Sequence, residues 1–349
     1  MVATAQVQVE VTGWLILGGH GQLGRSLSEV LDNGGTVNTA LGSSECDITD
    51  AAAVNTALGT HQPDVVVNCA AWTAVDAAED NETAATDINC AGAALVARAC
   101  RDNGSVLVHL STDYVFPGTK SDPYDETDPT GPVSAYGRSK LCGEEAVKRE
   151  HPDGSYVVRT AWLYGPHGGN FAKTMLRRAF ASAPVRVVDD QRGQPTLSTD
   201  LAQHLLGLVE SGSPYGTYHA TNSGATTWFG FARMIYELAG CDTGLVTPVP
   251  SSEYLTAAVR PANSVLGHAR TVAVGLVEMR PWYTALRTGI AVVPGMVQAL
   301  RSPGSHRLRL CARTDQHLSF CCQCRPRNPL FDRTERPGET GHGDERRSQ

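Results

Sequence analysis

Short apolar runs alternate with amphipathic stretches along most of the chain. The runs at residues 14–17, 64–68 and 106–110 are rich in Val, Leu and Ile and too short for helices, which is typical of buried strands in a parallel sheet. Between them, apolar positions such as Leu23 and Leu27 recur at helical spacing. This alternation predicts an α/β fold with a doubly wound, Rossmann-type parallel sheet.

The later part of the chain continues the alternation with more interruptions. We expect further strands at 36–41, 156–165 and 216–220, and helices at 136–150, 170–182, 198–211 and 228–239. The stretch between Phe116 and Tyr136 is rich in Pro, Gly, Asp and Thr, which predicts a long functional loop that walls the site. For the domains we expect a leader at 1–12, a dinucleotide-binding domain at 13–167 to which 197–240 return, and a smaller α/β substrate lobe from 168–196 and 241–290.

The composition narrows the class of protein. The chain has 349 residues, of which 41% are hydrophobic, enough for one large core and a smaller lobe. It lacks eighteen uninterrupted apolar residues and a basic, apolar signal start, so we expect a cytoplasmic protein that does not span a membrane. The net charge of −7 argues against a general nucleic-acid surface.

The segment 301–349 differs in kind from what precedes it. It carries ten Arg and no Lys against six acidic residues, and it has very little periodic apolar pattern. We expect a flexible tail there. Four of its residues are cysteines, but their spacing matches no regular zinc finger, and residues 1–290 hold no metal-spaced His/Cys cluster, so we assign no metal site.

The other six of the ten cysteines stand singly in apolar or helical patterns, as reduced core thiols would. We therefore expect free thiols at Cys46, Cys69, Cys90, Cys100, Cys142 and Cys241.

The first apolar run leads directly into a glycine-rich segment, Gly18-Gly19-His20-Gly21-Gln22-Leu23-Gly24. Between a strand and a helix, glycines at 18, 21 and 24 would allow a tight turn, close approach of a pyrophosphate, and packing of the helix on the strand. Without that context the same glycines would be an ordinary loop. With it, they predict a dinucleotide-binding loop.

A tyrosine and a lysine stand four residues apart in Tyr136-Gly137-Arg138-Ser139-Lys140, so both side chains share one face of a predicted helix. A nearby cation favours a phenolate, so we expect Lys140 to lower the pKa of Tyr136 from about 10 and make it a proton donor. The run at 106–113 delivers the Thr112 hydroxyl to the carboxyl end of a strand, where open α/β sheets place ligands. A tyrosine and a lysine at this spacing are more often an ordinary exposed pair on a helix. The glycine loop upstream favours the catalytic interpretation.

Four further segments carry a resemblance to a known family: NCAAWTAVD at 68–76, STDYVF at 111–116, DQRGQPT at 190–196 and RPANSVL at 260–266. With these, residues 13–290 resemble the extended short-chain dehydrogenases/reductases and, within them, the dTDP-4-dehydrorhamnose reductases. The glycine loop and the Tyr–Lys pair mark only the superfamily, whereas STDYVF and DQRGQPT resemble the reductase branch more specifically.

The resemblance implies roles for individual residues. Tyr136 would protonate the substrate oxygen, Thr112 would hydrogen-bond to it, and Lys140 would also hold the nicotinamide ribose. The cofactor would contact Tyr136, Lys140, Gly18, Gly21, Gln22, Leu23, Gly24, Asp47, Ile48, Ala71, Trp72 and Thr73. The substrate would contact Thr112, Asp113, Trp162 and Arg260.

Several of these residues have a second interpretation. Asp47 could belong to the cap region of a helix that begins near residue 50, and Asp113 could be a strand-end turn residue. Trp162 could be a core aromatic, and Arg260 could form a surface salt bridge. Asn89, where the family places a cofactor-facing amide, could equally be a buried structural amide.

The resemblance implies reduction of dTDP-4-dehydro-6-deoxy-L-mannose (dTDP-6-deoxy-L-lyxo-4-hexulose) to dTDP-L-rhamnose, with NADPH or NADH as the hydride donor. No Lys or Arg occurs from Ser26 to Ala97, the span that normally clamps a 2′-phosphate, and only Arg25 is placed to do so. We therefore expect NADH to work comparably to NADPH. Use of Mg²⁺ is implied only by the resemblance. We also expect a homodimer.

Two other functions stay open from the sequence. A nucleotide-sugar epimerase or dehydratase would use the same three residues but regenerate its cofactor. A non-catalytic, dinucleotide-binding regulatory subunit would keep the fold, although the complete set of Thr112, Tyr136 and Lys140 argues against it.

Overall fold

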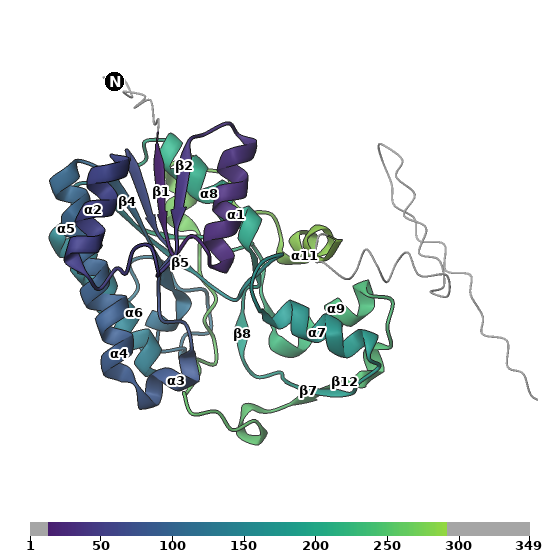
Figure 1. Cartoon of the computed structure of the whole chain (residues 1–349). Coiled ribbons are helices and arrows are strands. Elements are labelled where there is room, and N and C mark those ends of the chain that lie inside the picture. Colours follow the sequence, from purple (N-terminus) through teal and green to yellow (C-terminus); the bar gives the residue numbers. More distant parts are fainter. Residues whose placement is uncertain (1–12, 292–349) are drawn as a thin grey trace, which may run out of the picture. The chain divides into compact units, whose positions relative to one another are not determined.

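The computed structural model describes residues 13–291, so the expected leader at 1–12 and tail at 301–349 lie outside the described residues. A six-stranded parallel sheet forms the centre, with strand order β10-β5-β4-β3-β1-β2 (Figure 1). Its strands are β1 (Trp14–Leu17), β2 (Asn38–Leu41), β3 (Val65–Asn68), β4 (Val106–Thr112), β5 (Ser155–Thr160) and β10 (Gly216–His219). The predicted Rossmann-type sheet is confirmed.

Strand β1 shows why helices cover both faces of this sheet. All four of its residues are buried, with Trp14 and Ile16 in one core cluster and Leu15 and Leu17 in another. Since successive side chains point to opposite faces, each face needs its own apolar cover. The first face is covered by α1 (Gln22–Asn33) and α8 (Ser198–Glu210), and the second by α2 (Ala51–His61), α5 (Ala93–Asn103) and α6 (Ala135–Glu150).

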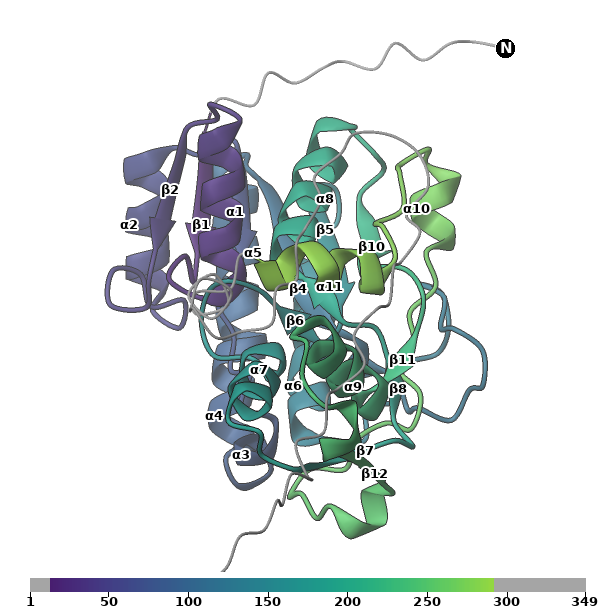
Figure 2. The same ribbon diagram turned by 90° about the vertical axis from the view of Figure 1, so that its right-hand side faces the viewer.

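A separate apolar cluster holds the later elements together, with Phe231 and Tyr236 fully buried in it. It is built from α7 (Phe171–Phe180), α9 (Trp228–Leu238), α11 (Trp282–Ala291) and the parallel pair β7 (Val185–Val188) and β12 (Val246–Val249) (Figure 2). Two short pairs accompany it, β6 (Leu163–Tyr164) with β9 (Thr196–Leu197) and β8 (Arg192–Gly193) with β11 (Thr226–Thr227).

The remaining elements are short. They are α3 (Val75–Asp80), α4 (Glu82–Thr86), the π-helical η1 (Asp87–Gly92), η2 (Asp113–Val115), η3 (Thr243–Leu245), η4 (Ser251–Glu253) and α10 (Ala269–Ala273). Within residues 13–291, no helix has both the length and the apolar character needed to cross a lipid bilayer.

The expected elements fall close to the observed ones, with two differences. The strand expected at 36–41 begins only at Asn38. The strand expected at 156–165 ends at Thr160 and resumes as β6, because Trp162 between them has a φ of 43°, a left-handed conformation that interrupts a strand. The stretch between Phe116 and Ser134 contains no helix or ladder strand, only a bridge from Tyr124 to Leu266, as the loop prediction requires.

Candidate active site

The glycine loop joins β1 to α1 as predicted, and Gly18, Gly19 and Gly24 are sterically required. Gly18 has a φ of 71°, and a Cβ there would lie 2.6 Å from the Ala70 backbone nitrogen. A Cβ on Gly24 would lie 2.6 Å from the Gly18 carbonyl oxygen. Helix α1 begins at Gln22 with no side-chain cap and no acidic residue in its first turn, which leaves its first N–H groups for an anion.

The two residues expected at the adenosine end, Asp47 and Ile48, follow β2. Ile48 is buried against Gly92, where a Cβ would lie 3.0 Å from the Ile48 Cδ1 atom. Asp47 is exposed and accepts hydrogen bonds from the backbone and hydroxyl of Thr49. The cap of α2 is Asp50, which accepts from the Ala52 N–H at 2.8 Å, so Asp47 itself does not cap that helix.

Three residues expected along the cofactor, Ala71, Trp72 and Thr73, follow β3 and lie beside the glycine loop, because Cys69 and Ala70 connect them to it. Ala71 and Trp72 are half-buried and Thr73 is exposed.

Thr112 and Tyr136 meet at the carboxyl end of β4, and Lys140 lies one turn along α6 from Tyr136. Thr112 is the last residue of β4 and is buried. A hydrogen bond with Thr112 is one of the influences on the pKa of Tyr136. Lys140 is 3% exposed, and its ammonium donates to the Leu110 carbonyl at 2.6 Å. The structure thus brings together the strand end and the helix face that the sequence predicted.

The expected effect of Lys140 on Tyr136 is wrong for this structure. Burial raises the pKa of Tyr136 to about 12, with the Asp113 charge adding to the rise and the Thr112 hydrogen bond opposing it. Lys140 is turned to the Leu110 carbonyl, and burial lowers the pKa of Lys140 to about 8. Tyr136 is therefore fully protonated at neutral pH, whereas Lys140 is mostly charged.

Asp113, directly after Thr112, is a buried acid in this site. It accepts a hydrogen bond from the Thr112 hydroxyl at 3.0 Å. Burial raises the pKa of Asp113 to about 7, against the opposing hydrogen bonds of Ser264 and Thr112. It begins η2 directly after β4, so it is a strand-end turn residue, and its contact with the sugar stays a prediction.

A buried ion pair that sequence reasoning missed anchors α6. The Arg159 guanidinium on β5 donates to both carboxylate oxygens of Glu144, at 2.8 and 2.7 Å, and the Ser111 hydroxyl donates to the same carboxylate at 2.6 Å. Glu144 and Arg159 are almost completely buried. The ion pair places α6 against β4 and β5 one turn beyond Lys140.

Asn89 resolves as a buried structural amide. Its side chain exchanges hydrogen bonds with the backbone of Trp72, at 2.8 and 3.1 Å, and donates to the Ser139 hydroxyl at 2.9 Å. Ser139 in turn donates to the Tyr136 carbonyl at 2.8 Å. Asn89 therefore links the segment after β3 to the first turn of α6.

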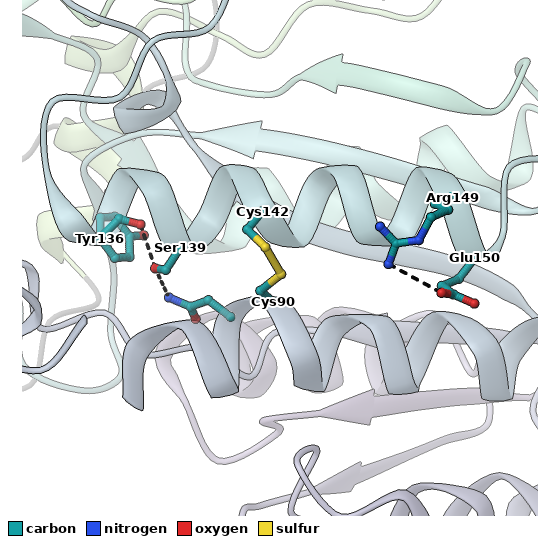
Figure 3. Close-up of a disulfide and its surroundings, with 7 residues drawn as sticks. Cys90, Tyr136, Ser139, Cys142, Arg149 and Glu150 are labelled. Carbon is teal, nitrogen blue, oxygen red and sulfur yellow. Dashed lines mark hydrogen bonds and ion pairs between the residues drawn. A yellow bond between two sulfur atoms is a disulfide. The ribbon is translucent and has the colours of Figure 1, made fainter. Parts of the chain in front are cut away.

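The expectation of free thiols at Cys90 and Cys142 is wrong, because these two residues form a disulfide between η1 and α6 (Figure 3). A close approach of the two helices makes the pairing geometrically accessible: a Cβ on Gly143 would lie 2.1 Å from the Asn89 carbonyl oxygen. A sequence separation of 52 residues gives no signal of such a contact. The other four cysteines of the described residues are free thiols: Cys46, Cys69, Cys100 and Cys241.

Trp162 lies at the border between the central sheet and the later elements. Its left-handed backbone turns the indole onto Trp228 of α9, and the two rings stack at 3.6 Å with an interplanar angle of 7°. Gly193 packs edge-on to it, where a Cβ would lie 2.4 Å from the ring. Trp162 is half-buried, so it is not a simple core aromatic. The stacking partner Trp228 was not predicted from the sequence.

Beside this stack lies a cavity of about 210 Å³, bordered by Phe171, Met175, Gln191, Trp228, Tyr254 and Arg260. Arg260 forms an ion pair, as one interpretation of the sequence required, and its partner is Asp76 at the start of α3. The Arg260 side chain is 19% exposed and borders the cavity, whereas the Asp76 side chain is 48% exposed, so the ion pair lies partly at the surface and partly at the cavity.

The fold and these side chains define a reductase of the short-chain dehydrogenase type. The RmlD substrate binding domain family matches residues 13–293. The chain is 48% identical to a dTDP-4-dehydrorhamnose reductase of Streptomyces griseus over 286 residues, which is 81% of this chain and 94% of that protein. It is 43% identical to the enzyme of that name from Mycobacterium tuberculosis H37Rv over 282 residues, 79% and 92% of the two chains.

Another relative and a solved structure agree with this. A dTDP-4-keto-6-deoxy-D-glucose reductase of Streptomyces niveus is 46% identical, with 78% of this chain and 94% of that one covered. The crystal structure of the Bacillus anthracis dTDP-4-dehydrorhamnose reductase in complex with NADP matches with a TM-score of 0.78 and 37% identity, covering 80% and 99% of the two chains. The chain belongs to the dTDP-4-dehydrorhamnose reductase family.

Proposed function

We propose that the protein reduces dTDP-4-dehydro-6-deoxy-L-mannose to dTDP-L-rhamnose with NAD(P)H. The observation that carries this proposal is that Thr112 and Tyr136 adjoin at the carboxyl end of β4, one helical turn from Lys140, in a chain of this family. Solved structures of a dTDP-glucose 4,6-dehydratase and a UDP-glucose 4-epimerase are 17% and 21% identical to this chain, which shows a shared fold alone.

The loop after β1 fits a dinucleotide. A Cβ added at Gly18 or at Gly24 would lie only 2.6 Å from neighbouring protein backbone, so only glycine allows the close packing of strand, turn and helix that a dinucleotide-binding loop has. The uncapped N–H groups of α1 follow, and together they offer space and donors for a pyrophosphate. Ala71, Trp72 and Thr73 would line the same cofactor, and Asp47 and Ile48 its adenosine end. The cofactor supplies the hydride, and the protein supplies position and charge.

The three catalytic candidates have complementary roles. Negative charge develops on the C4 oxygen of the sugar as the carbonyl is reduced, so that oxygen needs a proton and a hydrogen-bond donor. Tyr136, protonated at neutral pH, would give the proton, and the Thr112 hydroxyl would turn from the Asp113 carboxylate to donate a hydrogen bond. The ammonium of Lys140 would stabilise the phenolate left behind and hold the nicotinamide ribose.

The substrate would extend from these residues toward the later elements. Asp113 would contact the sugar, Trp162 would place its indole against it, and Arg260 would face the diphosphate. We expect the cofactor to bind the dinucleotide-binding domain at 13–167 with 197–240, and the substrate to reach the lobe at 168–196 with 241–290. This division into domains stays a prediction. Cytoplasmic location and a homodimer are also predictions, and light scattering tests the second.

Coenzyme choice follows from the charges at the end of β2. Glu45 accepts a hydrogen bond from the Gly42 N–H at 2.8 Å and lies 3.3 Å from the His20 ring of the glycine loop. A carboxylate there disfavours a 2′-phosphate, and the span 26–97 offers no Lys or Arg to bind one. We expect NADH to support turnover comparably to NADPH. A kcat/KM ratio of about 100 or more in favour of NADPH would contradict this.

The test is turnover of dTDP-6-deoxy-L-lyxo-4-hexulose with NADPH or NADH, followed by loss of nicotinamide absorbance. Stoichiometric coenzyme consumption with dTDP-L-rhamnose as product supports the proposal; unchanged coenzyme with isomerised sugar overturns it. Offering dTDP-4-keto-6-deoxy-D-glucose in parallel tests the reaction named for the Streptomyces niveus relative. Within residues 13–291 no group of three His, Cys, Asp or Glu side chains could share a metal ion, so we assign no step to Mg²⁺.

A further inference from the structure

A single carboxylate, that of Asp76, fixes both the backbone and the side chain of the segment that carries Arg260. Its Oδ1 atom accepts from the Arg260 Nη1 group and from the Ala258 N–H, each at 3.1 Å, and its Oδ2 atom accepts from the Arg260 Nη2 group at 2.7 Å. Asp76 lies at the start of α3, and Arg260 is 184 residues further along the chain.

The arrangement leaves one N–H of the guanidinium for a ligand. Arg260 Nη1 also donates to the Ala258 carbonyl at 3.1 Å, so Asp76 and Ala258 use both Nη1 hydrogens and one of the two on Nη2. Of the Nε–H and the second Nη2–H, one is donated to the Tyr114 hydroxyl. The other is a charge-assisted donor for a phosphate oxygen.

The charge of this group is secure. Burial alone would lower the pKa of Arg260, but the hydrogen bonds to Asp76 and the neighbouring Tyr114 raise it above its ordinary value. The hydrogen bonds from Arg260 lower the pKa of Asp76 despite partial burial, so both partners stay ionised at neutral pH. The Tyr114 ring makes an edge contact with Tyr136, 5.9 Å between centroids, which places the pair one aromatic ring from the proton donor.

We propose that Asp76 is a positioning residue for the nucleotide diphosphate: it holds the Arg260 guanidinium at the edge of the 210 Å³ cavity, where its remaining N–H can bind a phosphate oxygen. This inference rests on the proposed function, because it takes the substrate to be a nucleoside diphosphate sugar. Asp76 acts through Arg260 and does not contact the reacting atoms. Without it, Arg260 keeps its charge but loses its orientation.

The test compares Asp76→Asn with a matched control, Glu82→Gln. Glu82 forms a similar two-bond pair with Arg138, both bonds at 2.7 Å, on the neighbouring α4, away from the cavity. Calorimetry with dTDP and with dTMP measures the contribution of the second phosphate. We expect Asp76→Asn to weaken dTDP binding about tenfold, the loss of one charge-assisted contact, with a much smaller effect on dTMP. The KM of the sugar nucleotide should rise while kcat and NADPH affinity stay near wild type, and Glu82→Gln should change none of these.

Each contrary outcome is distinct. Unchanged or tighter dTDP binding by Asp76→Asn overturns the inference, since Asp76 would then be structural or would compete with the ligand. Equal losses of dTDP, dTMP and NADPH affinity indicate general disruption and also overturn it. In either case normal turnover by the wild-type protein still supports the proposed function. A wild-type protein that binds no dTDP would contradict both the inference and the proposed function.

Discussion

At the scale of single residues, burial sets the protonation of the site more than the neighbouring charges do. It raises the pKa of Tyr136 to about 12 and of Asp113 to about 7, and it lowers the pKa of Lys140 to about 8. In each case the neutral form gains because the charged form loses its hydration. Near pH 7 the site therefore holds a protonated phenol beside a cationic lysine, the pair of states that protonation of an oxyanion requires.

Tyr136→Phe tests the proton donor. The ring still fills its space against Tyr114, so NAD(P)H binding should persist, while loss of the general acid should reduce kcat by about 10²- to 10⁴-fold. Stopped-flow turnover and coenzyme fluorescence titration separate the two effects. Near wild-type turnover by this variant would rule out the assigned mechanism.

The basic limb of the pH profile tests Lys140. Its charged form is present below its pKa of about 8 and is lost above it, so kcat/KM, which reports the free enzyme, should fall as the pH rises through that point. Changes on the acidic side belong to Asp113, with its pKa of about 7. Lys140→Arg stays charged and should lack the fall, at a lower overall rate. A flat wild-type profile from pH 7 to 10 would contradict the assignment.

At the scale of elements, α6 is held from three directions. Glu144 pairs with Arg159 of β5 and accepts from Ser111 of β4 within the core. Ser139 is tied to Asn89, and Cys142 is joined to Cys90. A helix that carries both Tyr136 and Lys140 needs such fixed placement, because small displacements of reacting groups cost large factors in rate.

The Cys90–Cys142 disulfide gives an element-scale prediction. Closing a sequence separation of 52 residues should stabilise the oxidised protein by about 2–4 kcal/mol, so reduction should lower its melting temperature. The measurement is thermal unfolding with and without a phosphine reductant, alongside a thiol count that should rise by two. Cys241→Ser, at a half-buried free thiol, is the control and should respond to reductant as the wild type does. An unchanged thiol count would show that the two residues are not paired in solution.

At the scale of the whole molecule, the candidate site draws on residues from Gly18 to Arg260, and the family match ends at residue 293. Its parts are brought together by the parallel sheet, whose strand ends lie at one edge, and by segment contacts as distant as Asp76 with Arg260. The candidate residues therefore span nearly the whole matched region, and none of the residues assigned to the site lies in the segment 301–349.

A chain ending at residue 300 is accordingly expected to keep kcat/KM within about twofold of the full chain, the size of an ordinary surface change. Brief trypsin treatment offers a second route, since ten of the arginines lie in residues 301–349. Activity assays and thermal unfolding of both forms make the measurement. A trimmed protein that is inactive, or that melts far below the full chain, would show that the segment contributes to the fold or to an oligomer.

The sequence by itself determined what depends on local pattern. Runs such as 14–17 and 64–68 specify buried strands, the glycines at 18 and 24 specify a turn with no room for side chains, and the spacing of Tyr136 and Lys140 specifies a shared helix face. Each is readable because neighbours in the chain are neighbours in space. Most expected elements therefore agree with the fold.

Tertiary structure decided what depends on residues far apart in the chain. The Cys90–Cys142 bond, the stacking of Trp162 on Trp228, and the Asp76–Arg260 pair each join segments 52 to 184 residues apart. The direction of the Tyr136 pKa shift was predicted wrongly for the same reason, since it follows burial beneath surrounding elements and not the nearby lysine in sequence. Spacing along a helix places two side chains together, but only the packed fold sets how much water reaches them.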